Sequence, residues 1–362
     1  MSKTGDIITV FGCFALCIIV GIFTLVLPYQ DFSDEENRAL ADAPIFSIDS
    51  LMSGKYLSRF SEFFSDHIVM RNAFVRGRTV SELAMGRQEV GGVLFYSGGA
   101  LAQRGFDASE SLLRQNLLAI NGIEENAACI IVPRAIDILG LPMGEGESEA
   151  AVSIREAAYS MCGDGERLWE ALSEVGGERV YYATDHHLTT YGAYLCYDFL
   201  GERLGYEPMA RERFEVQTVS QDFRGTSYSA AGLISLVSDR VELWRYEGDD
   251  EIKVMRDGEE IPLYDLSFAR AKDKYRVFLG GNYGVLNVAG EGEKPSLLLV
   301  KDSYANALIP FLAAHFDITV VDPRYTSVTF SELVSGGEYD EILVFCGMDT
   351  LSTGNDFARL FR

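Results

Sequence analysis

The residues best suited to chemistry follow two apolar runs of the chain. Asp185, His186 and His187 follow one run, and Ser303 follows another. A serine hydroxyl attacks a carbonyl carbon when a histidine takes its proton and a carboxylate orients that histidine. In an extended segment the side chains of Asp185 and His187 point to one side, and that of His186 points away. We therefore predict Ser303 as nucleophile, His187 as general base and Asp185 as its orienting carboxylate.

Two other interpretations of these residues are open at this point. Ser303 could simply cap the next helix, and Asp185 and His187 could make loop hydrogen bonds. The Asp-His-His triplet also resembles that of metal-dependent phosphoesterases, which need further aspartates on other strand ends. His67 and His315 are far away in the sequence, and the cysteines show no metal-binding spacing. We expect no metal and no cofactor.

The scaffold of these residues is predicted from alternating apolar runs and helical segments. Near-continuous apolar strands between helices indicate a mainly parallel sheet covered on both faces. Five core strands are expected, over 128–132, 179–183, 296–301, 318–322 and 341–345. Helices are expected over 147–161, 166–175, 190–204, 304–316 and 329–336. Catalytic groups of such sheets gather beyond the carboxyl ends of the strands. The chain has no G-x-S-x-G, which disfavours the α/β-hydrolase pattern.

Two regions depart from this alternation. Residues 29–105 are predicted to form a helical lead followed by a β-hairpin, and the α/β domain spans 106–362. Within that domain, residues 208–290 are predicted to be an antiparallel β insertion, because short strands alternate with polar turns. The lead is expected to contain a helix start at Ser33, helices over 54–64 and 72–85, a local salt bridge and turn among Asp66, His67 and Arg71, and the hairpin over 88–105.

Residues 1–28 are predicted to be a short cytoplasmic tip and a transmembrane signal anchor. Ile7 to Leu27 is 21 residues without a charge, which spans about 30 Å as a helix. Lys3 precedes the run and acidic residues follow it, so the N-terminus is expected in the cytoplasm and the rest outside the cell. No small-x-small cleavage site follows, which favours an uncleaved single-pass anchor.

The composition excludes some classes of partner. With 31 basic and 54 acidic residues the formal net charge is −23, which excludes nucleic acid as a partner. Cys13 and Cys17 lie in the apolar run. Cys129 and Cys346 lie in strand-like runs and are expected to be buried thiols. A disulfide among the four outer cysteines, which also include Cys162 and Cys196, stays open.

Two long motifs resemble the bacterial DHHW protein family. They are TDHHLTTYGAY at 184–194 and KDSYANALIPFLAAHFDITVVDPRY at 301–325. The segments SDEENRALADAPIF at 33–46 and FLGGNYG at 278–284 match as well. The DHHW family is similar to the alginate O-acetyltransferase proteins of the SGNH-hydrolase-like superfamily. The resemblance covers essentially the whole chain after the apolar run.

The resemblance implies a flavodoxin-like, three-layer α/β/α core of SGNH type with a Ser-His-Asp site. Asp185, His187 and Ser303 map onto that site in the order of the alginate acetyltransferases, and Arg324 maps onto an active-site arginine. Leu188 stands where the family name has tryptophan, which removes a stacking surface for a sugar.

A second departure lies at the serine. Asp302 before Ser303 follows Lys301 instead of the common glycine. For the oxyanion we expect the backbone N–H of Tyr304 first, and Gly281 or Asn282 second.

These observations together predict a membrane-anchored extracellular O-acetyltransferase or acetylesterase acting on a surface or cell-wall glycan. A membrane-bound O-acyltransferase would be a suitable partner as acyl donor. The alternative is a non-catalytic glycan-binding or scaffold subunit of a surface-polymer machine, which the change at Leu188 favours.

Overall fold

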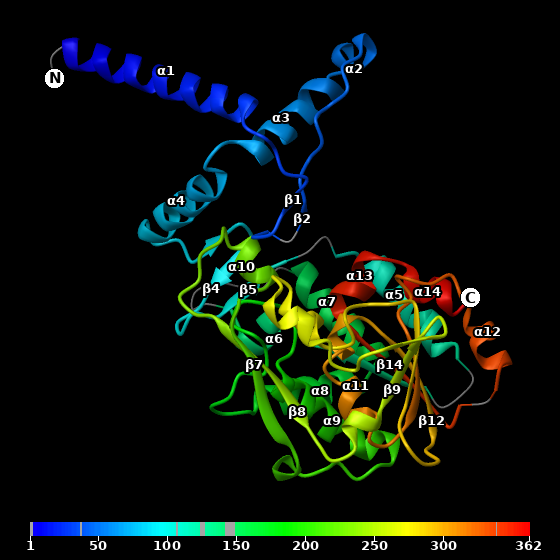
Figure 1. Ribbon diagram of the computed structural model, residues 1–362. Coiled ribbons are helices and arrows are strands. Elements are labelled where there is room, and N and C mark those ends of the chain that lie inside the picture. Colours follow the sequence, from blue (N-terminus) through cyan, green and yellow to red (C-terminus); the bar gives the residue numbers. More distant parts are fainter. Residues whose placement is uncertain (1–2, 37, 106–107, 124–126, 142–148, 338) are drawn as a thin grey trace. The chain divides into compact units, whose positions relative to one another are not determined.

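The computed structural model describes residues 3–36, 38–105, 108–123, 127–141, 149–337 and 339–362 (Figure 1). The chain divides into two compact units. The first comprises residues 1–91 and 229–234, and the second comprises residues 92–228 and 235–362. The predicted chemistry lies in the second unit, and the apolar N-terminal run lies in the first.

The first unit begins with a long apolar helix. Its elements are α1 (Lys3–Val26), β1 (Phe32–Ser33), β2 (Arg38–Ala39), α2 (Ile48–Met52), α3 (Lys55–His67), α4 (Arg71–Ala84) and β3 (Glu89–Val90). The span Ile7–Val26 of α1 is long and apolar enough to cross a membrane, and only 6% of it is buried. The helices α3 and α4 agree with the segments predicted over 54–64 and 72–85.

The expected helix start at Ser33 is wrong. Residues 34–36 form a turn between β1 and β2, although the Glu36 N–H still donates to Ser33 Oγ as it would at a helix cap. The reason is tertiary: the Glu36 carboxylate accepts hydrogen bonds from Arg38 and Arg71, and these ion pairs hold the chain in the turn. Asp66 and Arg71 do lie near each other, at 4.0 Å, but Asp66 is bound mainly by Arg38.

The second unit is built on a seven-stranded sheet. The strand order is β10-β9-β11-β13-β12-β14-β6. Its strands are β6 (Ala127–Val132), β9 (Lys253–Arg256), β10 (Glu259–Ile261), β11 (Val285–Ala289), β12 (Ser296–Lys301), β13 (Asp317–Val321) and β14 (Glu341–Gly347). The four strands from β13 to β6 are parallel, whereas β11, β9 and β10 extend the sheet with antiparallel pairs. β12, which leads to Ser303, is thus a central strand with parallel neighbours on both sides.

Both faces of this sheet are buried. Leu297 and Leu299 of β12 pack into one apolar cluster, and Leu298 and Val300 pack into another. The helices of this unit are α5 (Glu110–Asn121), α6 (Ala135–Leu139), α7 (Glu149–Met161), α8 (Asp164–Ser173), α9 (Thr190–Leu204), α11 (Ile309–Leu312), α12 (Phe330–Ser335), α13 (Met348–Thr353) and α14 (Asp356–Leu360). α10 (Thr226–Ala230) begins in the second unit, and four short 3-10 helices cover 211–213, 249–251, 266–270 and 274–277. The two clusters around β12 thus lie on opposite faces of the sheet, because successive residues of a strand point to opposite sides. This agrees with the prediction of a sheet covered on both faces.

Among the described residues of the second unit, two antiparallel pairs lie outside the main sheet. β4 (Val93–Phe95) pairs with β5 (Leu101–Gln103), which agrees with the hairpin expected over 88–105. β7 (Glu215–Phe223) pairs with β8 (Asp239–Arg245) inside the region 208–290.

Two of the predicted elements are wrong. Residues 179–183 do not join the sheet, because Val180 and Tyr182 bond instead to the backbone of 187–189, which folds back on them. The predicted helix over 304–316 is broken into a 3-10 turn at Ser303–Ala305 and the short α11. Pro310 lacks an N–H, so a continuous helix would lose a backbone hydrogen bond there. The six cysteines are free; Cys346 is buried and Cys129 is half-buried.

Candidate active site

Ser303, His187 and Asp185 lie in one line of hydrogen bonds. Ser303 Oγ is 2.9 Å from His187 Nε2, and His187 Nδ1 is 2.6 Å from Asp185 Oδ1. Because an ionised carboxylate only accepts, Nδ1 carries the ring proton and Nε2 accepts from the serine hydroxyl. His187 and Asp185 are buried, and Ser303 is half-buried. The geometry is that of a nucleophile, a base and an orienting carboxylate.

Local hydrogen bonds place Ser303 at the carboxyl end of β12. Asp302 caps the following 3-10 turn by accepting the N–H of Tyr304. The same carboxylate accepts the N–H of Gly347 and the hydroxyl of Thr350. Asp302 thereby ties the ends of β12 and β14 together, which explains why a buried aspartate precedes the serine. Burial raises the pKa of Asp302.

Asp185 accepts four hydrogen bonds. Oδ1 accepts the backbone N–H of His187 at 3.0 Å as well as its Nδ1–H, and Oδ2 accepts the N–H and hydroxyl of Thr226 at 2.7 and 3.0 Å. Although burial opposes the charge, His187, His186 and these hydrogen bonds hold the pKa of Asp185 well below its usual value. A Cβ at Gly225 would lie 2.0 Å from Oδ2, so this close approach requires glycine.

His187 is kept neutral by its surroundings. Burial and the neighbouring His186 lower the pKa of His187, and Asp185 opposes this shift. The ring stacks on that of Tyr275, with centroids 3.9 Å apart and planes 11° apart. The Tyr275 hydroxyl donates to the carbonyl oxygen of Ser303 at 3.0 Å and accepts the N–H of Ala307. Tyr275 therefore contacts both the His187 ring and the backbone of Ser303.

Sequence reasoning missed Tyr275 and Thr226. Tyr275 lies three residues before the motif FLGGNYG at 278–284. That motif could have indicated that neighbouring residues of the same loop also contact the site. No local sequence signal indicates Thr226. It reaches Asp185 only because the chain folds back 41 residues later.

The expectation that His186 points away from His187 is wrong. The two imidazole rings are 3.9 Å apart, and His186 Nδ1 lies 2.6 Å from Thr226 Oγ1. Because the threonine hydroxyl gives its proton to Asp185, it accepts the Nδ1–H of His186. This bond pulls His186 back over its neighbour. One hydroxyl thus connects His186 to the carboxylate that orients His187.

Arg324 and Asn282 lie in a polar cluster around Lys301. Arg324 makes a two-pronged ion pair with Asp322 at 2.9 and 2.7 Å, and Lys301 Nζ lies 3.5 Å from the same carboxylate. Lys301 also donates to the side-chain oxygens of Asn282 and Asn306 at 3.0 and 2.7 Å. Burial lowers the pKa of Lys301 to about 8, against the effect of Asp322.

The candidates for binding an oxyanion were the backbone N–H of Tyr304 and, second, Gly281 or Asn282. The N–H of Tyr304 donates to Asp302 at 3.0 Å, so it is engaged within the chain. Gly281 has a φ of 135°, a conformation that favours glycine. The carbonyl oxygen of the preceding residue, Gly280, accepts a hydrogen bond from Arg276, and this bond holds the loop in place.

The Asp185, His186 and His187 side chains could together offer three ligand atoms within 4.8 Å of one another. Both oxygens of Asp185 already accept two hydrogen bonds each. A metal ion bound there would compete with these donors for the Asp185 carboxylate. The arrangement therefore suits proton transfer better than metal binding.

A sequence comparison identifies the family. The family model described as "DHHW protein" matches residues 123–321, more than half of the chain. The chain belongs to the DHHW protein family. No curated relative matches it in sequence.

Solved structures share the fold of this DHHW protein. A DHHW family protein from Eubacterium siraeum DSM 15702 is 19% identical, with a TM-score of 0.59, over 75% of this chain and 95% of that one. Bacillus cereus PatB1, solved with a sulfonyl adduct, is 17% identical, with a TM-score of 0.58, over 73% and 98%. The O-acetyltransferase domain of Pseudomonas putida AlgJ is 13% identical, with a TM-score of 0.47, over 75% and 98%.

Leu188 replaces the tryptophan of the family name, and its position explains what the change affects. Leu188 is fully buried in the apolar cluster that also contains Tyr181 and Ala193. A residue there packs in the core and offers no surface to a sugar. The change at this DHHW position therefore bears on the packing of the core.

Proposed function

We propose that this DHHW protein is a serine-dependent acyl-transfer enzyme, an O-acetyltransferase or acetylesterase of SGNH type acting on a surface or cell-wall glycan. The observation that carries the proposal is the line from Ser303 through His187 to Asp185, with 2.9 and 2.6 Å between the heavy atoms. The three-layer α/β/α arrangement of SGNH proteins is part of it, and burial on both faces of the sheet supports it.

In the proposed first step, Ser303 Oγ attacks the carbonyl carbon of an acetyl ester while its proton passes to His187 Nε2. The tetrahedral intermediate then expels the alcohol, which takes that proton from His187, and the acetyl group stays on Ser303. Asp185 remains ionised and stabilises the imidazolium that forms in between.

In the second step, a sugar hydroxyl or water gives its proton to His187 and attacks the acetyl carbonyl. Ser303 leaves and regains a proton from His187, which returns the site to its starting state. A sugar as acceptor gives transfer, and water gives hydrolysis. No step needs a cofactor.

The cellular setting is also part of the proposal. The α1 span of 20 uncharged residues with 6% burial supports a single-pass anchor. Lys3 at its start and the acidic residues after it support an N-terminus in the cytoplasm and the large unit outside. The partners would be the glycan and a membrane-bound O-acyltransferase that supplies acetyl groups. Protease added to spheroplasts should digest the large fragment, and full protection of that fragment would contradict this topology.

A sulfonyl reagent tests the proposed nucleophile. Sulfonyl groups react with activated hydroxyls, and the fold relative PatB1 has been solved with a sulfonyl adduct. The full-length chain in detergent should gain one sulfonyl group, mapped to Ser303 by peptide mass spectrometry. The matched control is His187→Ala, which keeps the hydroxyl and removes the base and should stay unmodified. An adduct elsewhere, or one that forms equally in His187→Ala, would refute an activated Ser303.

The alternative of a non-catalytic glycan-binding or scaffold subunit depended on Leu188. Because Leu188 lies in the core, its replacement of tryptophan no longer favours that alternative.

A further inference from the structure

The first unit exposes an unusual amount of apolar surface beyond α1. Seven large apolar residues between positions 45 and 60 are exposed, Ile45 to 90% and Met52 to 81%: Ile45, Phe46, Ile48, Leu51, Met52, Leu57 and Phe60. We call these seven residues the apolar arm. Soluble proteins seldom leave such a continuous stretch in water, so a surface of this kind normally has a partner.

Helix α3 divides cleanly into two sides. Tyr56, Phe60 and Phe64 follow one another along one side, with ring centroids 6.2 and 6.3 Å apart. Ser58 and the acidic residues lie on the other. An apolar stripe with this spacing is typical of a helix whose apolar side is buried against a partner or an apolar environment.

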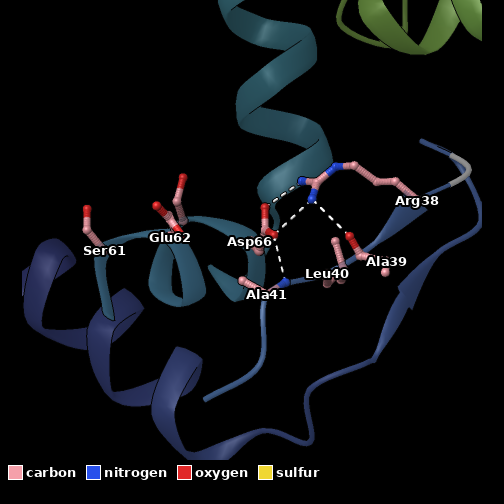
Figure 2. A pocket seen from close by; sticks show the side chains of 8 residues that line it. Arg38, Ala39, Leu40, Ala41, Ser61, Glu62 and Asp66 are labelled. Carbon is pink, nitrogen blue, oxygen red and sulfur yellow. Dashed lines mark hydrogen bonds and ion pairs between the residues drawn. The ribbon is translucent and has the colours of Figure 1, made fainter. Parts of the chain in front are cut away.

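The polar side of α3 lines a hollow of the first unit, and of the apolar side only Phe63 is buried. Figure 2 shows Ser61, Glu62 and Asp66 of α3 along a hollow of about 550 Å³, with residues 38–41 on its other wall. Asp66 accepts hydrogen bonds from Arg38 and from the N–H of Ala41. Arg38 holds the pKa of Asp66 down at about 2, so the pair stays charged.

The end of α1 is attached to the end of α3. Thr24 Oγ1 of α1 accepts the N–H of Val69 at 3.1 Å. The ring of Tyr29 packs edge-on against Phe63 and His67, with centroids 5.4 and 5.3 Å apart. Because α3 has 13 residues, the arm residues Leu57 and Phe60 lie within about 20 Å, one helix length, of this attachment.

The charge of the chain also sets this region apart. Residues 1–91 contain 8 Lys and Arg against 11 Asp and Glu, whereas residues 92–362 contain 23 against 43. The strong negative charge that opposes approach to a lipid surface therefore belongs to the remainder of the chain. Near-neutral charge beside exposed aromatic and aliphatic residues suits the headgroup region of a bilayer.

We propose that the apolar arm lies in the interfacial layer of the membrane that α1 crosses, with Leu57 and Phe60 turned toward the acyl chains. The proposal rests on the membrane anchoring proposed above. Two points of attachment, one spanning and one lying along the surface, would fix the first unit on the bilayer. A second copy of the chain or another membrane protein is the competing occupant.

Quenching by brominated lipid tests this placement. The full-length chain carrying Leu57→Trp is reconstituted into phosphatidylcholine vesicles with and without dibrominated acyl chains. The matched control is Ser58→Trp, one residue further along α3 on its polar side. The native Trp169 and Trp244 lie in the second unit and give the baseline. We expect the tryptophan at position 57 to be quenched about twofold more than that at position 58.

The outcomes separate the arm from the anchor. Flotation of the vesicles first shows whether the chain is membrane-bound. A chain that floats but shows equal quenching at both positions retains its anchor and refutes the arm. Equal quenching together with a concentration-dependent cross-link through the arm would assign it to a second copy. A chain that does not float refutes the anchor and the arm together.

Discussion

The ring of Tyr275 lies parallel to the imidazole of His187, 3.9 Å away, while its hydroxyl binds the carbonyl oxygen of Ser303. One side chain thus contacts both the predicted base and the predicted nucleophile. Stacking limits rotation of the imidazole, and the hydrogen bond limits movement of the turn that carries the serine. Positioning of this kind matters because displacements of about 1 Å cost about 100-fold in rate.

Replacing Tyr275 separates its two contacts. Tyr275→Phe keeps the stacked ring and loses the hydroxyl, so we expect kcat to fall about tenfold with little change in the pH profile. Tyr275→Leu loses both contacts, and we expect a fall of about 100-fold. Steady-state hydrolysis of an acetyl ester measures both, with thermal melts as the control for folding. Equal activity of all three proteins would show that the stack has no positioning role.

Acid should abolish the proposed activity through His187. Burial lowers the pKa of His187 below its ordinary 6.5, and only the neutral ring can accept the serine proton. Activity is therefore expected to be full at neutral pH and to fall only when the pH drops through a value below 6.5. A profile of kcat/KM between pH 4 and 8 measures this limb. A midpoint above 6.5 would contradict a neutral, buried base.

The two neighbouring histidines should differ sharply. Ser303→Ala and His187→Ala are expected to lose nearly all activity because triad members act as a unit. Asp185→Asn should lose heavily as well, since the corresponding change in a serine-protease triad costs about 10⁴-fold. His186→Ala should cost only about tenfold. It should also move the acid limb to higher pH, because His186 lowers the pKa of His187. An inactive His186→Ala beside an active His187→Ala would reverse the assignment.

Gly225 should tolerate no side chain. The Cβ of Gly225→Ala would lie 2.0 Å from Asp185 Oδ2, so the carboxylate must move and its bonds to Thr226 must break. We expect loss of most activity and a lower melting temperature. Gly176, where a Cβ would meet nothing within 4 Å, provides the control as Gly176→Ala. Similar activity in the two variants would show that Asp185 need not be held this tightly.

Buried Lys301 should make stability depend on alkaline pH. Burial lowers its pKa from 10.5 to about 8, so the unfolded chain binds more protons than the folded chain between these values. The free energy of unfolding should therefore rise with pH across that window, by roughly 3 kcal/mol at most. Urea unfolding at pH 7.5 and 10 measures the change, with Lys301→Met as the reference that lacks the proton. An identical pH dependence in both proteins would contradict the shift.

The sequence predicted the elements whose signal is local. The apolar runs at 128–132, 296–301 and 341–345 became parallel strands, and α9 begins and ends at the residues expected for it. Residues 179–183 do not form the predicted strand of the sheet, because their backbone pairs with residues 187–189. The apolar content of the segment does not reveal that the chain folds back on it in this way. Ser303, His187 and Asp185 could be named from residue type and motif. Tyr275 and Thr226 could not, because only the folded chain brings them to the site.

Ser303 and His187 are 116 residues apart in the chain yet meet at 2.9 Å. Closing a loop of that size is a late, entropically costly event compared with forming local helices. A chain whose His187 segment has formed but whose β12 has not would still lack its predicted nucleophile. Ester hydrolysis would therefore appear only after the whole second unit has closed, and its onset marks the end of folding.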